Sequence, residues 1–131
     1  MAYRRLDTDS VRVQPLAERR SKHALADILV DPDGPATESG AMAPIIDRVA
    51  SAVRAAREAD ASVILCYGAH LVKNGLGPVV ERLLEYGWVT HLATNGAGVI
   101  HDWEYAFGGR SEEDVRRNVA AGTFGAWDET G

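Results

Sequence analysis

The sequence predicts an α/β fold in which a Rossmann-like parallel sheet is flanked by helices. Three observations lead to this prediction. Two short runs, Ser62–Cys66 and Trp88–Leu92, have the nearly continuous apolar character of buried parallel strands. Each run passes into a segment rich in glycine and then into a helical pattern. The helical stretch between the runs is long enough for a right-handed crossover. Because only two or three convincing strands fit into 131 residues, we expect an incomplete half of such a sheet.

The first 40 residues are predicted to form an N-terminal arm and a short helix. Residues 1–20 are polar with scattered apolar positions, which is typical of an extended arm lying on another part of the protein. Ser21–Leu29 places its apolar residues on one side of a helix and begins with a capping serine. Asp31–Pro35 then breaks the chain. We therefore separate residues 1–40 from a Rossmann-like nucleotide-binding half-domain at residues 41–131.

Four further helices are predicted in this half-domain. Apolar residues recur at three- and four-residue spacing from Ala43 onward. Gly77–Tyr86 carries a second apolar stripe, and Gly87 follows in the position that glycine favours after a helix. His101–Phe107 has the pattern of a helical start. Ser111–Asp114 is a Ser-x-x-acid signal that predicts the cap of another helix.

Composition limits the function classes. A hydrophobic content of 46% indicates one domain with a core, and a net charge of −5 argues against a general nucleic-acid binder. The basic pairs Arg4–Arg5 and Arg19–Lys22 are interpreted as solvated surface. Cys66, the single cysteine, is interpreted as a buried, inert thiol in a reducing compartment. With no apolar segment after Met1 that resembles a signal peptide and no long apolar span, we expect a cytoplasmic protein without a membrane partner.

The first glycine segment, Gly68–Gly75, has the features of an anion-binding loop. It follows an apolar run and precedes a helical pattern, so its backbone N–H groups and a helix N-terminus would point toward a ligand. Lys73 would neutralise a pyrophosphate or be a solvated charge. The candidate cofactor-binding residues here are Gly68, Ala69, His70, Lys73, Asn74 and Gly75.

The second glycine segment, Thr94–Gly98, supplies the other half of the predicted pocket. Glycine allows close approach of the backbone to a ligand and positive φ angles. The spacing departs from the dinucleotide fingerprint because His101 occupies the third glycine position. A tight strand–helix turn without a ligand is the alternative interpretation. The candidate cofactor-binding residues here are Thr94, Asn95, Gly96, Ala97 and Gly98.

The densest cluster of ionisable residues in the chain follows this segment and consists of His101, Asp102 and Glu104. These three are the candidate catalytic residues, and Asp102 is also a candidate for ribose binding. A metal site is the other chemistry that such residues support. We assign no metal ligand, since the spacing matches neither H-E-x-x-H nor a structural zinc pattern.

The two glycine segments resemble deoxyhypusine synthase and its prokaryotic relatives. In that family the first loop has two glycines at the separation of Gly68 and Gly75, and the second is a Thr–Ala–Gly–Gly type turn followed by paired acidic residues. Uncharacterised bacterial members are closer still, with Gly-Ala-His-x-x-Lys and Asn-Gly-Ala-Gly-x-x-His-Asp. The resemblance covers residues 60–131, and the paired motifs that carry it are moderately specific.

This resemblance implies that residues 68–75 and 94–98 line an NAD pocket and that Asp102 and Glu104 contact ribose or an amine substrate. It also implies a tetramer with cofactor sites at subunit interfaces. The family enzyme forms an imine on a lysine in its C-terminal half, and no such segment occurs up to Gly131. We therefore do not carry over its spermidine-to-lysine reaction, and we expect a fragment or one of two pieces that complete one sheet.

Three functions remain open. The leading hypothesis is an NAD-dependent transferase or oxidoreductase, or half of one, that acts on an amine or small polar substrate by transient oxidation while His101 and Glu104 handle protons. The second is a non-catalytic nucleotide-binding or assembly subunit that needs a partner chain. The third is a metal-assisted hydrolase using His70, His101 and Asp102. We expect a homo-oligomer or a companion chain that completes the sheet.

Overall fold

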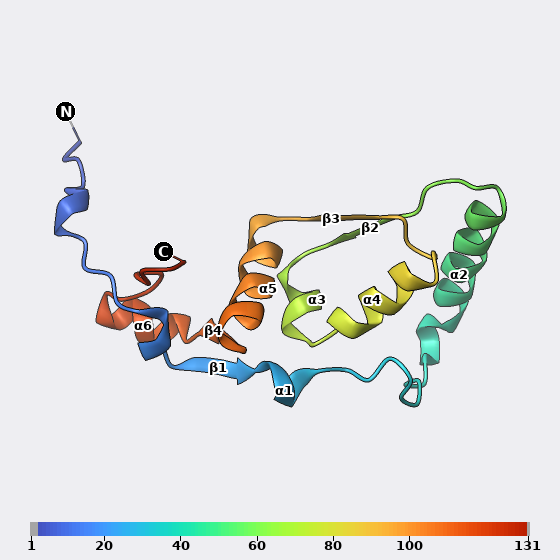
Figure 1. Cartoon of the computed structure of the whole chain (residues 1–131), viewed down its shortest axis with the longest axis horizontal. Helices are drawn as coiled ribbons and strands as arrows, with labels where there is room; N and C mark the ends of the chain where they lie inside the picture. Colours follow the sequence, from blue (N-terminus) through green and yellow to red (C-terminus); the bar gives the residue numbers. More distant parts are fainter. Residues whose placement is uncertain (1–2, 131) are drawn as a thin grey trace.

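The computed structural model describes residues 3–130 and shows a mixed α/β protein (Figure 1). Among these residues, no helix combines the length and the apolar character needed to cross a bilayer. The strands are β1 (Ser21–Ala24), β2 (Ile64–Tyr67), β3 (His91–Thr94) and β4 (Arg110–Glu113). The α-helices are α1 (Leu25–Ile28), α2 (Ala43–Glu58), α3 (Ala69–Lys73), α4 (Gly77–Glu85), α5 (Gly96–Gly108) and α6 (Val115–Ala121), with short 3-10 helices at Thr8–Ser10, Leu16–Glu18 and Gly40–Met42.

Strands β2 and β3 are adjacent and parallel, which confirms the predicted pairing of the two apolar runs. The register runs from Ile64 opposite His91 to Tyr67 opposite Thr94, so both strands begin later than the apolar runs. The Thr90 hydroxyl accepts a hydrogen bond from the Val63 N–H and donates one to the Val63 carbonyl. The Thr90 and His91 N–H groups also donate to this carbonyl, so side-chain and backbone bonds together join the two segments just before the strands begin.

Strands β1 and β4 form a separate antiparallel pair, which the sequence did not predict. The expected helix at Ser21–Leu29 is wrong in its first half, because Ser21–Ala24 is a strand. The expected cap at Ser111 is also wrong, since Ser111 lies within β4. Helix α6 is capped instead by Asp114, whose carboxylate accepts from the Arg117 N–H. Pairing between segments far apart in the chain overrides their local helical patterns.

The helices around β2 and β3 follow the sequence more closely. Helix α2 begins at Ala43 and α4 begins at Gly77, as predicted, and Gly87 follows α4 with a φ of +69°. Helix α5 begins earlier than predicted, at Gly96 rather than His101. Its first turn therefore includes most of the second glycine segment.

The N-terminal segment meets the C-terminal segment at Gln14. The Gln14 N–H donates to the Ala126 carbonyl over 3.0 Å, and the Asp128 N–H donates to the Gln14 carbonyl over 2.9 Å. Both segments lie beside α6 at one end of the molecule, and α2 lies at the other (Figure 1).

The molecule is open, with few buried apolar side chains. Its accessible surface is 10004 Å², whereas a compact chain of this size is expected to expose about 6,700 Å². The expectation of a buried Cys66 is wrong, because the thiol is exposed. It shares one face of β2 with Ile64, which is 60% exposed. The buried apolar residues are Leu16, Val80, Val89, Tyr105 and Trp127.

Candidate functional site

The two glycine segments adjoin at the carboxyl ends of the parallel strand pair. Strand β2 leads into Gly68, the N-cap of α3, and β3 leads into Asn95, the N-cap of α5. A Cβ placed on Gly68 would lie 3.6 Å from the side-chain amide nitrogen of Asn95. This edge of a parallel pair is where ligands bind in α/β proteins.

The second glycine segment is a strand end, a cap and the first turn of α5. The Asn95 side chain accepts a hydrogen bond from the Gly98 N–H over 3.0 Å. Neither Gly96 nor Gly98 has a positive φ, contrary to the expected use of glycine here. A Cβ on Gly98 would collide with the Thr94 hydroxyl, whereas a Cβ on Gly96 would meet nothing within 4 Å. Packing against Thr94 therefore explains why position 98 is a glycine, whereas position 96 has room for a side chain.

The first glycine segment consists of α3 and the turn that follows it. Gly75 has a φ of +73°, and a Cβ there would collide with the Ile28 carbonyl oxygen. The Gly75 carbonyl also accepts from the Val30 N–H over 3.0 Å. The structure therefore gives Gly75 a packing role. Other residues of this segment line a cavity of ≈ 440 Å³, named here the α3 cavity, which is formed by His23, Ile28, His70, Lys73, Asn74 and Glu112.

Lys73 is neither a free charge nor fully solvated. Its ammonium lies 3.0 Å from the Glu112 carboxylate, and the two side chains are 23% and 16% exposed. Glu112 has a φ of +67°, an uncommon value for a residue other than glycine. A phosphate that used Lys73 would have to compete with Glu112.

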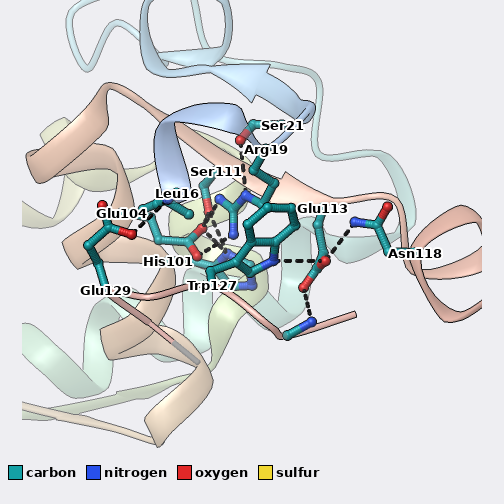
Figure 2. A network of polar contacts seen from close by, with 11 residues as sticks. Leu16, Arg19, Ser21, His101, Glu104, Ser111, Glu113, Asn118, Trp127 and Glu129 are labelled. Atoms are coloured by element: carbon teal, nitrogen blue, oxygen red, sulfur yellow. Dashed lines mark hydrogen bonds and ion pairs between the residues drawn. The ribbon is translucent and has the colours of Figure 1, made fainter. Parts of the chain in front are cut away.

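A buried polar network joins α5 to β4 and to the N-terminal segment (Figure 2). Arg19 forms two hydrogen bonds to the Glu104 carboxylate, of 2.6 and 2.7 Å. The Ser111 hydroxyl donates to the same carboxylate over 2.5 Å. His101 Nδ1 lies 2.6 Å from the Ser111 hydroxyl oxygen. Ser111 is 0% exposed and Glu104 is 3% exposed, whereas the His101 side chain is 21% exposed. The network is therefore buried at Ser111 and Glu104 and reaches the surface at His101.

Local structure explains how these side chains meet. His101 and Glu104 are three residues apart on α5 and therefore share one face of the helix. The helix ends at Gly108, the next residue Gly109 has the left-handed conformation, and β4 then returns Ser111 toward that face. The Trp127 ring lies over Arg19, with 5.9 Å from the guanidinium carbon to the ring centre.

The network fixes the charges of its members. Burial opposes ionisation of Glu104, but the hydrogen bonds from Arg19 and Ser111 outweigh it and lower the pKa of this carboxyl. Burial lowers the pKa of His101 from its ordinary value of 6.5, even though the Glu104 carboxylate acts in the opposite direction. At neutral pH, Glu104 is therefore ionised and His101 is largely uncharged.

A second cavity of ≈ 410 Å³, named here the α5 cavity, brings part of the predicted site together. Lys73 and Glu112 line this cavity as well as the α3 cavity. Asp102 is exposed on α5 and takes no part in the network described above. The side chains lining the α5 cavity include Arg19, Lys22, Lys73, His101, Glu104, Glu112 and Trp127.

Sequence reasoning missed two members of this network. Arg19 was expected on the solvated surface, but it is 8% exposed. Ser111 was expected to cap a helix. No local pattern marks either residue. Arg19 pairs with Glu104 across 85 positions of the chain, and Ser111 reaches Glu104 only because the chain turns back after α5.

The hypothetical metal site does not form within residues 3–130. No group of three or more His, Cys, Asp or Glu side chains there is arranged to hold a metal ion. His70 on α3 and Asp102 on α5 are both exposed, and only His101 of the three belongs to the buried network.

Comparison with known proteins gives one partial similarity to report. A stretch of 50 residues, 38% of this chain, is 42% identical to a protein of Methanopyrus kandleri named "Probable deoxyhypusine synthase". The matched stretch spans only 17% of that protein. No protein-family model matches the chain, and no solved structure is significantly similar to it. The similarity supports a relationship to deoxyhypusine synthases.

Proposed function

We propose that this chain is the nucleotide-binding part of a deoxyhypusine synthase-like, NAD-dependent enzyme that acts on an amine or small polar substrate. The main support is the meeting of two glycine segments at the carboxyl ends of parallel strands β2 and β3. The partial similarity to the Methanopyrus kandleri protein points to the same class. On this proposal, β2 and β3 belong to a larger Rossmann-like sheet.

The donors at this edge fit a pyrophosphate. The N–H groups of Gly96 and Ala97 lie in the first turn of α5, where a helix has no internal acceptors for them. The Asn95 side-chain oxygen is engaged by the Gly98 N–H, so its amide nitrogen is the group left to donate. When bound, NAD would supply the hydride acceptor.

His101 is the proposed proton acceptor. It follows Gly96 by five positions on α5, or about 7.5 Å along the helix axis, which a dinucleotide can span. Glu104 has both oxygens engaged by Arg19 and Ser111. We therefore propose that Glu104 orients its neighbours, whereas His101 exchanges the proton with the substrate.

Substitution of Gly96 tests this function. Gly96→Val should weaken NAD binding at least tenfold, or about 1.4 kcal/mol, because the new side chain would occupy the approach to the α5 N-terminus. Gly108→Val is the matched control, since it lies at the other end of α5 and its Cβ also meets nothing within 4 Å. Isothermal titration calorimetry with NAD, alongside a thermal melt, measures both.

Two results would overturn the proposal. One is the absence of NAD binding by the wild-type protein, and the other is undiminished affinity in a folded Gly96→Val variant. The second result would mean that this segment is only a turn. Gly98→Val is a poorer test, because its side chain would also disturb the packing against Thr94.

The second candidate is a non-catalytic nucleotide-binding or assembly subunit. The large exposed apolar surface, which includes three residues of α2, favours this candidate. NAD binding without turnover in the presence of amines, together with a stable complex with another chain, would favour it over the enzyme.

A further inference from the structure

The position of Ser111 between a base and a carboxylate restricts where its proton can be. Its hydroxyl oxygen lies 2.5 Å from Glu104 Oε2 and 2.6 Å from His101 Nδ1. The hydroxyl has a single hydrogen to donate. It is completely buried, so water does not supply an alternative partner.

The charge of Glu104 decides the direction of that hydrogen bond. The paired Arg19 guanidinium keeps Glu104 ionised, and an ionised carboxylate only accepts hydrogen bonds. The Ser111 hydrogen must therefore point to Glu104. The Ser111 oxygen then accepts from His101, which requires the hydrogen of the neutral imidazole to be on Nδ1.

We propose that Ser111 is a positioning residue that holds neutral His101 as the Nδ1-protonated tautomer and leaves Nε2 as the proton-accepting nitrogen. His101 lines the α5 cavity, so a ligand in this cavity would meet a base of fixed orientation. The same arrangement, a histidine oriented through its other ring nitrogen by a polar group, is how histidine bases are generally positioned.

The chemical consequence rests on the proposed function and concerns a protonated amine. Its N–H bond breaks, the electron pair stays on the amine nitrogen, and a new N–H bond forms at His101 Nε2. The resulting imidazolium keeps its Nδ1–H bond to Ser111. The Glu104 carboxylate beyond Ser111 stabilises the positive charge.

Charged groups from several elements act on His101. Glu104 on the same helix and Glu112 on β4 raise its pKa, whereas Lys73 on α3 and Arg19 from the N-terminal segment lower it. Desolvation is the largest of these influences and favours the neutral ring. The imidazole is therefore neutral, and in this form one ring nitrogen donates a hydrogen bond while the other accepts a proton.

Nitrogen NMR of the imidazole rings tests the inference directly. The chain has four histidines, and His101→Gln identifies the signals of His101 by their loss. In the wild-type protein near pH 8, we expect Nδ1 to have the shift of a protonated nitrogen and Nε2 that of an unprotonated one. A protonated Nε2 with a bare Nδ1 would overturn the proposal.

Variants of Ser111 test its part in fixing the tautomer. Ser111→Ala removes the acceptor for Nδ1–H, so Nε2–H should become populated and the two nitrogen shifts should move toward each other. Ser111→Cys occupies similar space with a weaker partner and should shift less. Ser51→Ala, at an exposed position on α2, is the control and should leave the spectrum unchanged.

An unchanged Nδ1–H tautomer in folded Ser111→Ala would overturn the role of Ser111. Should neither Ser111 variant fold, the wild-type spectrum still decides the tautomer. Calorimetry with NAD on the same samples separates the two claims, because a failure to bind NAD would remove the proposed function without changing the observed tautomer.

Discussion

At the scale of single residues, Arg19 and Glu104 form a buried ion pair with two hydrogen bonds. Both side chains are 3% exposed, and the guanidinium contacts both carboxylate oxygens. Desolvation offsets much of the attraction in such a pair, but removal of one partner would leave the other charge buried and unpaired. The pair therefore fixes the N-terminal segment against α5 more than it adds net stability.

Tyr105 shows the opposite situation, a buried polar group without a partner. The residue is 4% exposed, and its hydroxyl has no hydrogen-bond partner within residues 3–130. Burial raises the pKa of this phenol, and the nearby Glu112 and Glu104 carboxylates raise it further. The hydroxyl is therefore desolvated without compensation.

We expect Tyr105→Phe to leave the free energy of unfolding unchanged or to raise it by about 1 kcal/mol. The ring would still fill its site, and the unsatisfied hydroxyl would be gone. Urea unfolding followed by tryptophan fluorescence measures the change. A loss of more than about 1 kcal/mol would indicate that the hydroxyl has a partner in solution.

At the scale of elements, the turn after α3 joins the N-terminal residues 1–40 to the rest of the chain. Gly75 combines a left-handed backbone with close contact to the residue that ends α1. The Val30 N–H also bonds to the Gly75 carbonyl. This turn holds the segment after α1 against the end of α3, and so it places part of the α3 cavity wall.

A left-handed backbone alone costs a residue other than glycine about 1–2 kcal/mol. Gly75→Ala is expected to destabilise the protein by more than this, because its Cβ would also collide with Ile28. Gly77→Ala is the matched control two residues on. Its Cβ meets nothing within 4 Å, and it starts α4, where alanine is a better helix former. Thermal melts of both variants test this difference. Equal melting temperatures would show that the turn adapts.

At the scale of the whole molecule, the exposed surface is too large for a compact chain of this length. Helix α2 contributes no buried residue, and its apolar stripe at Ile45, Ile46 and Val49 is 44%, 49% and 55% exposed. Parallel sheets are normally covered on both faces, yet β3 is exposed along its whole length. We interpret this exposed apolar surface as one that another polypeptide chain covers.

We predict that the protein associates with itself or with a companion chain through this surface, burying at least about 2,000 Å² in total, as obligate partners do. Sedimentation analysis at micromolar concentration should show a species larger than the monomer. Val49→Asp on the apolar stripe should weaken association. Ser51→Asp adds the same charge to the same helix at an exposed position off the stripe and should not. A well-folded wild-type monomer would contradict the prediction.

Local patterns in the sequence were sufficient for the elements around β2 and β3. The apolar runs predicted a parallel pair, and the stripe after Gly77 predicted the crossover helix, because these signals depend only on neighbouring residues. The glycine segments were correctly placed at the strand ends. Their individual glycines were not correctly interpreted, since a sequence does not show which backbone atoms will face Gly75 or Gly98.

The buried network needed the tertiary structure. His101 and Glu104 were recognisable as an ionisable pair on one helix, but Ser111 was mistaken for a cap and Arg19 for a surface charge. The turn after α5 returns Ser111 to that helix, and the pairing of β1 with β4 brings the segment that carries Arg19 to the same place from a distant position in the chain. Residue type and local spacing therefore determined which chemistry was available, whereas long-range strand pairing decided which side chains lost their water and became partners, because desolvation depends on all the surrounding segments at once.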